Sequence, residues 1–549
     1  MGVLGGGVGG LSAAHELAER GFDVTVYEMR DAFGGKARSM DVPKSAQGGR
    51  QPLPGEHGFR FFPGFYRHLT DTMQRIPHPA GDTVAHHLVD ATRVLIARNG
   101  KEQNELIVPA QAPTTLTDVA ALTKVVYEFG VKLGIRPWEV AFFVERLTRL
   151  LTSCDERRFN EFENQSWWEF VRAERMSEGF QKFLADGLTR TLVAARAKEM
   201  SARTGGLILC QLLFDIARVG GRADRVLDGP TSDVWIDPWI ARLRRYGRIT
   251  WNLEHEVTGI DCVGKRITGV SLKTPGGPES GVHDYYIAAL PVERLIDLLT
   301  PQLRSAEPRL SKLTNLKVRW MNGVMFYLDR DVPLQRGHTI FIDSAWSLTA
   351  ISQAQFWPDV NLDERGDGKV DGILSVDVSE WDRPSERTGL KAKDCTEDEI
   401  YDEVWAQLVD AINDGSLRKE NIVDKFLDPA VKLPNPANPT KQSINLEPLL
   451  INTAGSWESR PDAVTNIENF FLAADFVRTN TDLATMEGAN EAARRAVNGI
   501  LDACDSAASR CEVWKLHEPV AFEPLRALDR VRWQLEAPLR KLGLPGLIP

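Results

Sequence analysis

The first thirty residues carry a pattern of apolar and polar positions that predicts a strand, a helix and a second strand. Residues 1–4 form a short apolar run, and residues 23–28 alternate between apolar and polar side chains, as strands do. Between them, apolar residues three or four positions apart mark one face of a helix that ends at Gly21. These face residues are Leu11, Ala14, Leu17 and Ala18. We therefore expect a βαβ unit at the start of the chain.

The rest of the chain mixes helical and strand periodicities. Residues 469–501 read as an apolar strand, an acidic turn and a long helix that begins near Met486. Other segments have the spacing of helices or are short apolar runs typical of strands. The helices are expected at 116–133, 139–151 and 397–412, and the strands at 323–328 and 372–378. Helices and strands together predict an α/β protein.

Composition excludes several classes of protein. The chain has 549 residues, 43% of them hydrophobic, and a net charge of −10, so we expect no nucleic-acid partner. The six cysteines form no CxxC pair, which is typical of a protein kept in a reducing cytoplasm. The apolar run at 204–214 is well short of the roughly 20 residues that span a bilayer. No basic segment precedes an apolar one at the N-terminus, so we expect no signal peptide.

The glycine-rich turn at residues 5–10 has the pattern G-x-G-x-x-G. Gly5 and Gly7 would let the backbone, with Val8 and Gly9, approach a pyrophosphate at the helix N-terminus, and Gly10 would allow close packing of the helix. Glu28, at the end of the second strand, is placed to bind ribose hydroxyls. Both NAD and FAD bind to turns of this kind, and the residues that follow distinguish between them.

Residues 31–39 read DAFGGKARS and resemble the GG-[RK]-x-x-S element of flavoproteins in the amine oxidase and phytoene desaturase superfamily. That resemblance implies FAD, with its pyrophosphate and flavin side near a set of glycines and basic residues. The set is Gly34, Gly35, Lys36 and Arg38.

Residues 469–501 closely resemble the FLAGD…MEGA…G segment that closes the FAD site of carotenoid desaturases. The resemblance implies that Asp475 faces the ribityl or phosphate part of FAD, and Ala474 replaces the glycine that usually precedes it. A helix N-terminus at Met486 could stabilise negative charge on the flavin pyrimidine ring. Thr485 and Ala489 belong to the same implied contact set.

Residues 55–66 read GEHGFRFFPGFY and resemble the E-x-G-x-H-x-F-x-G-x-Y segment of plant and cyanobacterial phytoene and ζ-carotene desaturases. With this segment the likeness covers roughly residues 1–505. It implies FAD contacts at Gly58, Phe59 and Arg60, and at Val257 in a later strand pair. Two residues depart from the pattern, since Arg60 replaces a histidine and His57 replaces a small residue. A cation and an imidazole would suit a substrate with a polar end, and a structural, ion-paired Arg60 is the alternative.

The same resemblance predicts a fold and a division of the chain. We expect an α/β protein with a Rossmann-type FAD-binding domain and an inserted substrate domain, which combines a mixed sheet with a helical cap. The FAD-binding domain would be discontinuous, with a C-terminal amphipathic helical tail at the end. The expected parts are 1–75, 225–300 and 455–505 for FAD, 76–224 for the cap, 301–454 for the sheet and 506–549 for the tail.

The predicted function is desaturation of a carotenoid-like, isoprenoid-like or other apolar or amphiphilic substrate by hydride transfer to flavin N5. His57 or Glu56 would accept the proton, and Arg60 is the third catalytic candidate. Aromatic residues would line the substrate channel, although clusters of this kind are often plain core. The candidates are Phe61, Phe62, Trp167 and Trp168. The electron acceptor stays open.

Other functions on the same scaffold remain open. An amine or amino-acid oxidase would carry a lysine beside the flavin, where our alignment places Asn322, with Lys317 out of register. Hydroxysqualene dehydroxylation and carotenoid isomerisation share the motifs described above. A flavin-binding interaction protein without turnover is a rival of another class, although a cap over the flavin would have little purpose in it.

Two further expectations concern partners. Leucines and a valine at helical spacing in 525–542, with arginines on the other faces, suit docking on a membrane surface or a subunit, or packing on the chain's own domain. A membrane contact would make the protein peripheral. His78, His86 and His87 lack a carboxylate partner in a known ligand motif, so we expect no metal site.

Overall fold

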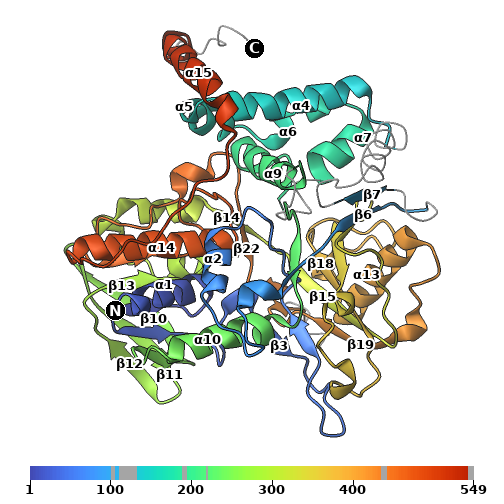
Figure 1. Cartoon of the computed structure of the whole chain (residues 1–549), viewed down its shortest axis with the longest axis horizontal. Helices are drawn as coiled ribbons and strands as arrows, with labels where there is room; N and C mark the ends of the chain where they lie inside the picture. Colours follow the sequence, from blue (N-terminus) through green and yellow to red (C-terminus); the bar gives the residue numbers. More distant parts are fainter. Residues whose placement is uncertain (101–105, 110–132, 188–194, 218–220, 435–441, 542–549) are drawn as a thin grey trace.

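The computed structural model describes the chain except for residues 101–105, 110–132, 188–194, 218–220, 435–441 and 542–549. Figure 1 shows a layered α/β region on one side, a second sheet region on the other, and helices across one end of both. The expected helix at 116–133 falls outside the described residues except for Leu133.

A five-stranded parallel sheet forms the first region, in the order β23-β13-β1-β2-β9. The residues of β1, β13 and β23 are all buried, which is typical of parallel strands covered on both faces. Its strands come from the three segments expected to form the FAD-binding domain. They are β1 (Gly2–Leu4), β2 (Val24–Tyr27), β9 (Ile249–Asn252), β13 (Tyr286–Ala288) and β23 (Phe470–Leu472).

Helices pack against this sheet. The predicted first helix is α1 (Val8–Glu19), and the long helix near Met486 is α14 (Met486–Ala503). These two pack on each other, and α10 (Asp237–Arg244) lies nearby (Figure 1). A separate antiparallel sheet continues the region beyond β9. It consists of β10 (Glu256–Val263), β11 (Arg266–Thr274) and β12 (Gly277–Gly281).

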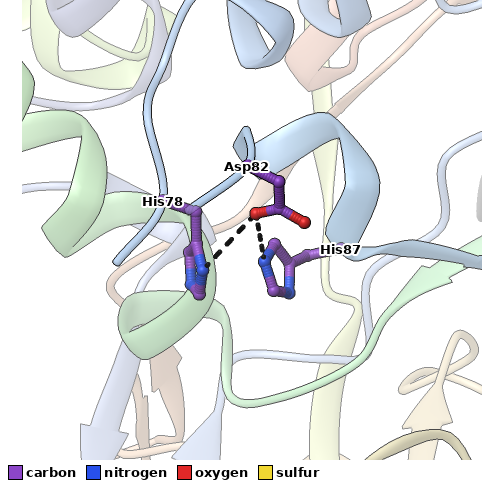
Figure 2. A group of neighbouring side chains, drawn as sticks. All are labelled: His78, Asp82 and His87. Atoms are coloured by element: carbon purple, nitrogen blue, oxygen red, sulfur yellow. Dashed lines mark hydrogen bonds and ion pairs between the residues drawn. The ribbon is translucent and has the colours of Figure 1, made fainter. Parts of the chain in front are cut away.

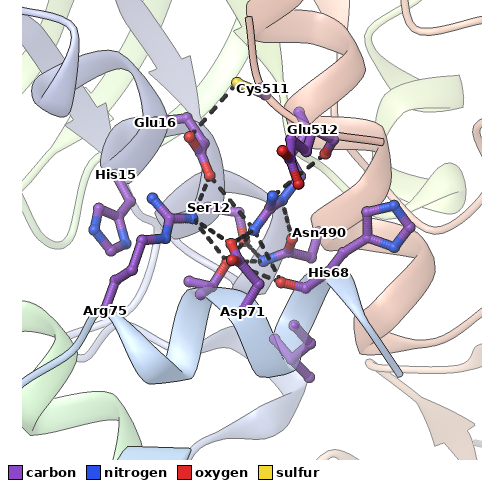
Figure 3. Close-up of polar contacts among 12 residues, drawn as sticks. Ser12, His15, Glu16, His68, Asp71, Arg75, Asn490, Cys511 and Glu512 are labelled. Atoms are coloured by element: carbon purple, nitrogen blue, oxygen red, sulfur yellow. Dashed lines mark hydrogen bonds and ion pairs between the residues drawn. The ribbon is translucent and has the colours of Figure 1, made fainter. Parts of the chain in front are cut away.

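A buried polar cluster joins α1 and α14 to α2 (His68–Gln74) (Figure 3). Arg494 Nη2 donates to Asp71 Oδ2 at 2.5 Å, and Arg75 Nη2 donates to Glu16 Oε1 at 2.5 Å. Burial alone would raise the pKa of Glu16, but Arg75 and Arg494 lower it. The paired charges fix three helices that lie far apart in the sequence.

A seven-stranded sheet forms the second region, and two of its strands come from outside the range 301–454 that was expected to form it. Strands β6 and β7 fall in the range 76–224 expected to be a helical cap, yet they extend this sheet through a parallel pairing of β6 with β16. Helix α13 (Glu397–Ile412) has the predicted bounds and packs on the sheet through Trp405 and Phe326. In spatial order the strands are β19 (Ile422–Leu427), β15 (Asn322–Leu328), β18 (Gly372–Val378), β17 (Leu348–Ser352), β16 (Thr339–Phe341), β6 (Arg93–Ala97) and β7 (Leu106–Pro109).

Short strand pairs connect the two regions. The pair β14 and β22 and the pair β5 and β8 lie where the chain passes between regions, and β3 pairs with β4 just before the 55–66 segment. These elements are β3 (Ser39–Asp41), β4 (Pro54–Glu56), β5 (Leu88–Asp90), β8 (Arg225–Leu227), β14 (Lys317–Arg319) and β22 (Leu449–Ile451), and a further pair is β20 (Val431–Lys432) with β21 (Ile444–Asn445).

The cap is helical and has its own apolar core. Its predicted helix at 139–151 is part of α4 (Pro137–Thr152), which Pro137 and the Glu139 carboxylate begin. The other cap helices are α5 (Asp155–Arg157), α6 (Trp167–Phe170), α7 (Glu178–Phe180) and α9 (Ala202–Ala217). No helix in the described ranges has both the length and the hydropathy that a bilayer span requires.

The tail packs on the cap through its polar face. Helix α15 (Glu523–Leu535) is followed by α16 (Ala537–Lys541), so the expected continuous helix is interrupted at Glu536. Arg157 of the cap bonds to Asp529 at 3.1 Å and to Glu536 at 3.0 Å. Exposed apolar residues remain on the helix, namely Leu525, Leu528, Val531 and Leu535. Leu542 lies outside the described residues.

Candidate functional site

A cavity of about 550 Å³ lies at the carboxyl edge of the parallel sheet. Its walls include residues that directly follow four of the strands, such as Gly5 after β1, Glu28 after β2, Ala289 after β13 and Ala473 after β23. Ligands of open parallel sheets bind at this edge, because the loops that follow the strands converge there.

The glycine turn lies at one part of the wall, at the N-terminus of α1. Gly5, Gly7, Val8 and Gly9 all line the cavity. A Cβ on Gly9 would lie 2.1 Å from the carbonyl oxygen of Ala473, whereas one on Gly7 would meet nothing closer than 3.7 Å. The turn therefore packs closely against the sheet at Gly9, while Gly7 lines the cavity with only an ordinary contact to Gly35, which fits an approaching pyrophosphate.

Gly10 has the predicted packing role and does not line the cavity. A Cβ at this position would lie 1.9 Å from the carbonyl oxygen of Gly5. The close approach of α1 to the end of β1 thus requires a residue without a side chain.

Glu28 is held at the cavity wall by two backbone groups. Its carboxylate accepts hydrogen bonds from the N–H of Gly6 at 2.9 Å and from the N–H of Arg30 at 3.0 Å. Val257, on β10, lines the same cavity. This fixed carboxylate beside the glycine turn fits the ribose hydroxyls of a dinucleotide.

The second glycine pair lies against the first turn. Gly34 has φ 108° and donates its N–H to the carbonyl of Gly6 at 2.9 Å, and Gly35 has φ 58°. Lys36 lines the cavity, where its ammonium donates to the carbonyl of Pro448. Arg38 is not part of the wall, since its Nη1 donates to the carbonyl of Gly35 at 2.6 Å.

The segment before α14 supplies another part of the wall. Ala474, Asp475, Thr485, Met486 and Ala489 all line the cavity, as the resemblance implied. The carboxylate of the first-turn residue, Glu487, instead accepts hydrogen bonds from the N-terminal backbone of α2. The N-terminus of α14, which is the positive end of its dipole, lies at the cavity wall.

A buried polar cluster meets the cavity at His57. Its Nδ1 lies 2.5 Å from Oδ2 of Asp428, and its Nε2 has no hydrogen-bond partner among the described residues. Burial lowers the pKa of His57, although Asp428 opposes the shift. His57 is therefore neutral at pH 7, and the nearby carboxylate favours the tautomer with its proton on Nδ1.

Asp377 lines the same cavity and was not predicted from the sequence. Burial raises the pKa of its carboxyl to about 7, against the effects of Arg60 and His338. Its Oδ1 has no hydrogen-bond partner in the described part of the chain. An aspartate within the mostly apolar segment 372–378 was the available signal, and every residue of β18 is buried.

The other two catalytic candidates form a buried ion pair, with Arg60 Nη2 3.8 Å from Glu56 Oε2, but only one of them lines the cavity. Glu56 does not line the cavity, because its carboxylate accepts hydrogen bonds from Thr231 and Ser39, and burial raises its pKa. Arg60 does line it, and its guanidinium donates to the carbonyls of Gly58 and Lys36, each at 2.6 Å. These bonds favour a structural role for Arg60.

The aromatic candidates divide in the same way. Phe61 lines the cavity, as does Phe59, and both rings contact His338. Phe62 is fully buried against Trp235. Trp167 lies in the core of the cap and Trp168 lies under Lys198, so neither lines the cavity. The expected substrate contact of these last three residues therefore has no support in the cavity wall.

A parallel sheet with a glycine turn, a fixed carboxylate at the end of the second strand and a helix N-terminus at the same cavity defines a dinucleotide-binding protein. The sequence carries this class further: the model for flavin-containing amine oxidoreductases matches residues 8–501, and the chain belongs to this family. FAD is its cofactor, and the protein is an FAD-dependent oxidoreductase. The glycine turn that lines the cavity, the carboxylate of Glu28 and the α14 N-terminus fit that cofactor.

Individual relatives are more distant. The 15-cis-phytoene desaturase of Synechococcus elongatus is 24% identical over 504 residues, which cover 89% of this chain and 92% of that protein. A putrescine oxidase bound to putrescine aligns over 91% of this chain and 98% of its own, with a TM-score of 0.59 and 12% identity. Cyclohexylamine oxidase from Brevibacterium oxydans aligns over 92% of this chain and 99% of its own, with a TM-score of 0.58 and 14% identity. The two structural likenesses show the fold alone.

Proposed function

We propose that this oxidoreductase desaturates an apolar, isoprenoid-like substrate. The observation that carries the proposal is the wall around His57, where Phe59, Phe61 and Met321 provide apolar surface. Among the described residues, Lys36 is the only lysine in this wall, and its ammonium donates to the carbonyl of Pro448. The desaturase relative from Synechococcus elongatus, similar along most of the chain, supports the same class of substrate.

FAD, when bound, supplies a two-electron acceptor for hydride. The protein's own task is to hold an apolar chain, exclude water and accept the proton that leaves the neighbouring carbon. His57 is placed to accept it at Nε2, because this atom is buried and without a partner in the described residues. Asp428 beside Nδ1 stabilises the imidazolium that results.

The aromatic wall contributes to binding and to charge. The rings of Phe59 and Phe61 present faces or edges to the cavity beside His338. Such faces tolerate the partial positive charge that develops on a carbon losing hydride. The guanidinium of Arg60 has few donors to offer a substrate headgroup, because it already bonds to backbone carbonyls.

Amine oxidation is the second candidate function, and the position where its lysine was expected does not support it, because Asn322 stands there. Asn322, at the aligned position, is buried and donates to Asp428 at 2.6 Å. Lys317 lies on β14, is exposed to solvent and is not part of the cavity wall. Dehydroxylation and isomerisation would use the same apolar wall, so the products distinguish them from desaturation.

The test is to purify the protein with its flavin and identify the lipids that a solvent extract contains. The extracted polyene or isoprenoid is then mixed anaerobically with the oxidised protein. Loss of flavin absorbance together with a product that has gained a double bond supports the proposal. An isomer or a deoxygenated product assigns one of the related activities. Flavin reduction by amines but by no isoprenoid would overturn the proposal.

We also propose that the exposed apolar face of α15 rests on a lipid surface. Leu528 and Leu535 are each 66% exposed, while the polar face of the helix is bonded to the cap. The neighbouring helix α4 carries two further exposed apolar residues, Trp138 and Val144. A bilayer is also the phase in which an isoprenoid substrate dissolves, so docking would bring the cap to it.

A further inference from the structure

Three side chains that can bind a metal converge on the connection between α2 and the short helix η2 (Val84–His87) (Figure 2). His87 Nε2 lies 3.2 Å from Asp82 Oδ1, and His78 Nδ1 lies 3.9 Å from the same oxygen. One ligand atom from each of the three residues lies within 4.8 Å of the others. Asp82 is the carboxylate partner that the sequence analysis did not find for these histidines.

The backbone of this connection holds the three residues together. The N–H of His78 donates to the carbonyl of Asp82 at 2.9 Å, and the N–H of Gly81 donates to the carbonyl of His78 at 3.0 Å. Gly81 has φ 99°, which residues with a side chain rarely adopt. These hydrogen bonds fix the conformation of the turn, which brings the side chains of His78 and Asp82 toward each other.

His87 is held from its other side by Asp228, which follows β8. Its Nδ1 lies 2.9 Å from Asp228 Oδ2, and the N–H of Asp228 donates to the carbonyl of His87 at 3.1 Å. A neutral imidazole has one N–H, so it can donate to only one of two flanking carboxylates. With the proton on Nδ1, the lone pair of Nε2 faces Asp82, and a cation between them relieves the repulsion.

This arrangement has the parts of a histidine metal site. A carboxylate that accepts from the second ring nitrogen fixes the tautomer of a ligand histidine, as Asp228 does for His87. His78 Nδ1 also accepts from the N–H of Ala80 at 3.2 Å, and metal binding at Nδ1 would replace this bond and leave the exposed N–H to water. All three ligands are thus available without the loss of a buried hydrogen bond.

The ligand set and its spacing select the ion. Two imidazoles and one carboxylate suit Zn²⁺ and its neighbours better than Ca²⁺ or Mg²⁺, which prefer oxygen ligands. Ligand atoms in a tetrahedral site with bonds of about 2.0–2.1 Å lie about 3.3 Å apart. The separations of 3.2 and 3.9 Å bracket that value, and the rings of His78 and His87, whose centroids lie 3.6 Å apart, would have to move apart for both nitrogens to face one ion.

We propose that His78, Asp82 and His87 bind one Zn²⁺ ion, with water in the remaining position and Asp228 orienting His87. The ion would cross-link the α2–η2 connection, and Asp228 would tie its ligand His87 to the end of β8, next to the pairing of β5 with β8. It would therefore stabilise a place where the chain leaves the FAD-binding region, apart from the flavin cavity. None of its ligands lines that cavity.

The test uses untagged, FAD-loaded protein freed of metal with a chelator and titrated with ZnCl₂ in a calorimeter. One ion per chain is expected, and retained zinc is counted by elemental analysis after gel filtration. His78→Gln and His87→Gln should each weaken binding by at least about tenfold, and Asp228→Asn by roughly 10- to 100-fold. Zinc should also raise the melting temperature of the wild type but not of the ligand variants.

His86→Gln is the matched control, because His86 is an exposed neighbour whose Nδ1 lies 3.1 Å from Thr83 Oγ1 outside the cluster. It should bind zinc as the wild type does. Asp82→Asn changes a side chain that is 41% exposed, so it reports even if a histidine variant fails to fold. Absence of saturable binding in the wild type, or equal loss in His86→Gln and His87→Gln, would overturn the proposal.

Discussion

His57 Nδ1 lies 2.5 Å from Asp428 Oδ2, and both side chains are nearly inaccessible to solvent beside the FAD cavity. The two residues come from distant segments, the 55–66 motif and the loop directly after β19. The pKa of Asp428 is lowered despite its burial, because His57 lies beside it and Asn322 donates to it. The carboxylate therefore stays ionised and polarises the imidazole.

Replacement of His57 tests its role as proton acceptor. We expect His57→Gln to slow flavin reduction by substrate by about 10²- to 10⁴-fold, which is the usual contribution of a general base. Because burial lowers the pKa of His57, the wild-type rate should persist into mildly acidic solution. Anaerobic stopped-flow measurements across pH give both quantities, and the flavin spectrum controls for folding. A variant that reduces its flavin as fast as the wild type would contradict the assignment.

Asp377 gives stability a distinct dependence on pH. Its pKa is raised from an ordinary value of 3.8 to about 7, so the folded protein binds the proton more tightly than the unfolded chain. Stability from this group is fully present below about pH 4 and is lost as pH rises to about 7. At pH 8 we expect the free energy of unfolding of Asp377→Asn to exceed that of the wild type by at most on the order of 4 kcal/mol. The variant should therefore melt at a higher temperature.

The difference between Asp377→Asn and the wild type should shrink as the pH falls toward 4, where both side chains are neutral. Thermal denaturation of the two FAD-loaded proteins at several pH values measures it. Asp371→Asn is the control, because Asp371 lies just before the same strand and is exposed. An equal offset at all pH values would show that the substitution acts through packing instead.

The first and last parts of the FAD region could be predicted because their signals are local. A glycine turn between a strand and a helix, or an apolar strand before a capped helix, is complete within some thirty residues. Helix α13 has the expected bounds for the same reason, since Thr396 and Glu399 form a capping box before an amphipathic face. Strand β6 could not be placed, because its partner β16 lies more than two hundred residues away.

The site follows the same rule. Phe61 and Phe62 are adjacent, so their side chains point in different directions, and sequence alone did not tell which one faces the cavity. Asp377 reaches it only through the pairing of β18 with β15 and β17. Residues that act through the register of a sheet carry no local motif, whereas those that contact the dinucleotide do.

Glu28 provides a test of cofactor retention. Glu28→Ala removes the acceptor for the N–H groups of Gly6 and Arg30 and for the ribose, so the turn loses its anchor. Loss of a hydrogen bond to a charged group costs about 1.5–3 kcal/mol, so FAD should bind roughly 10- to 100-fold more weakly. Titration of the deflavinated protein with FAD measures the affinity. Asp31→Ala, an exposed neighbour, should retain wild-type affinity.

Arg60 separates a structural role from a substrate role. Arg60→Lys keeps the charge but cannot reproduce donation to Gly58 and Lys36 together. We expect a loss of about 1–3 kcal/mol in stability and weaker FAD retention, with the substrate KM of the flavin-loaded fraction unchanged. Denaturant unfolding and steady-state kinetics give the two values. A rise in KM with unaltered stability would instead assign Arg60 to the substrate.

The tail is tested by adding charge to the exposed face of α15. The protein should float with vesicles that contain anionic lipid, because Leu528 and Leu535 can enter the interface. Leu528→Asp and Leu535→Asp should abolish flotation without a change in melting temperature, since neither side chain is packed. Gln534→Asp adds the same charge at an exposed position that lies off the apolar stripe, and it should still float. If all three variants lose flotation alike, net charge and not the apolar face decides the binding. If the wild type itself does not float and forms dimers, the leucines contact a second copy of the chain.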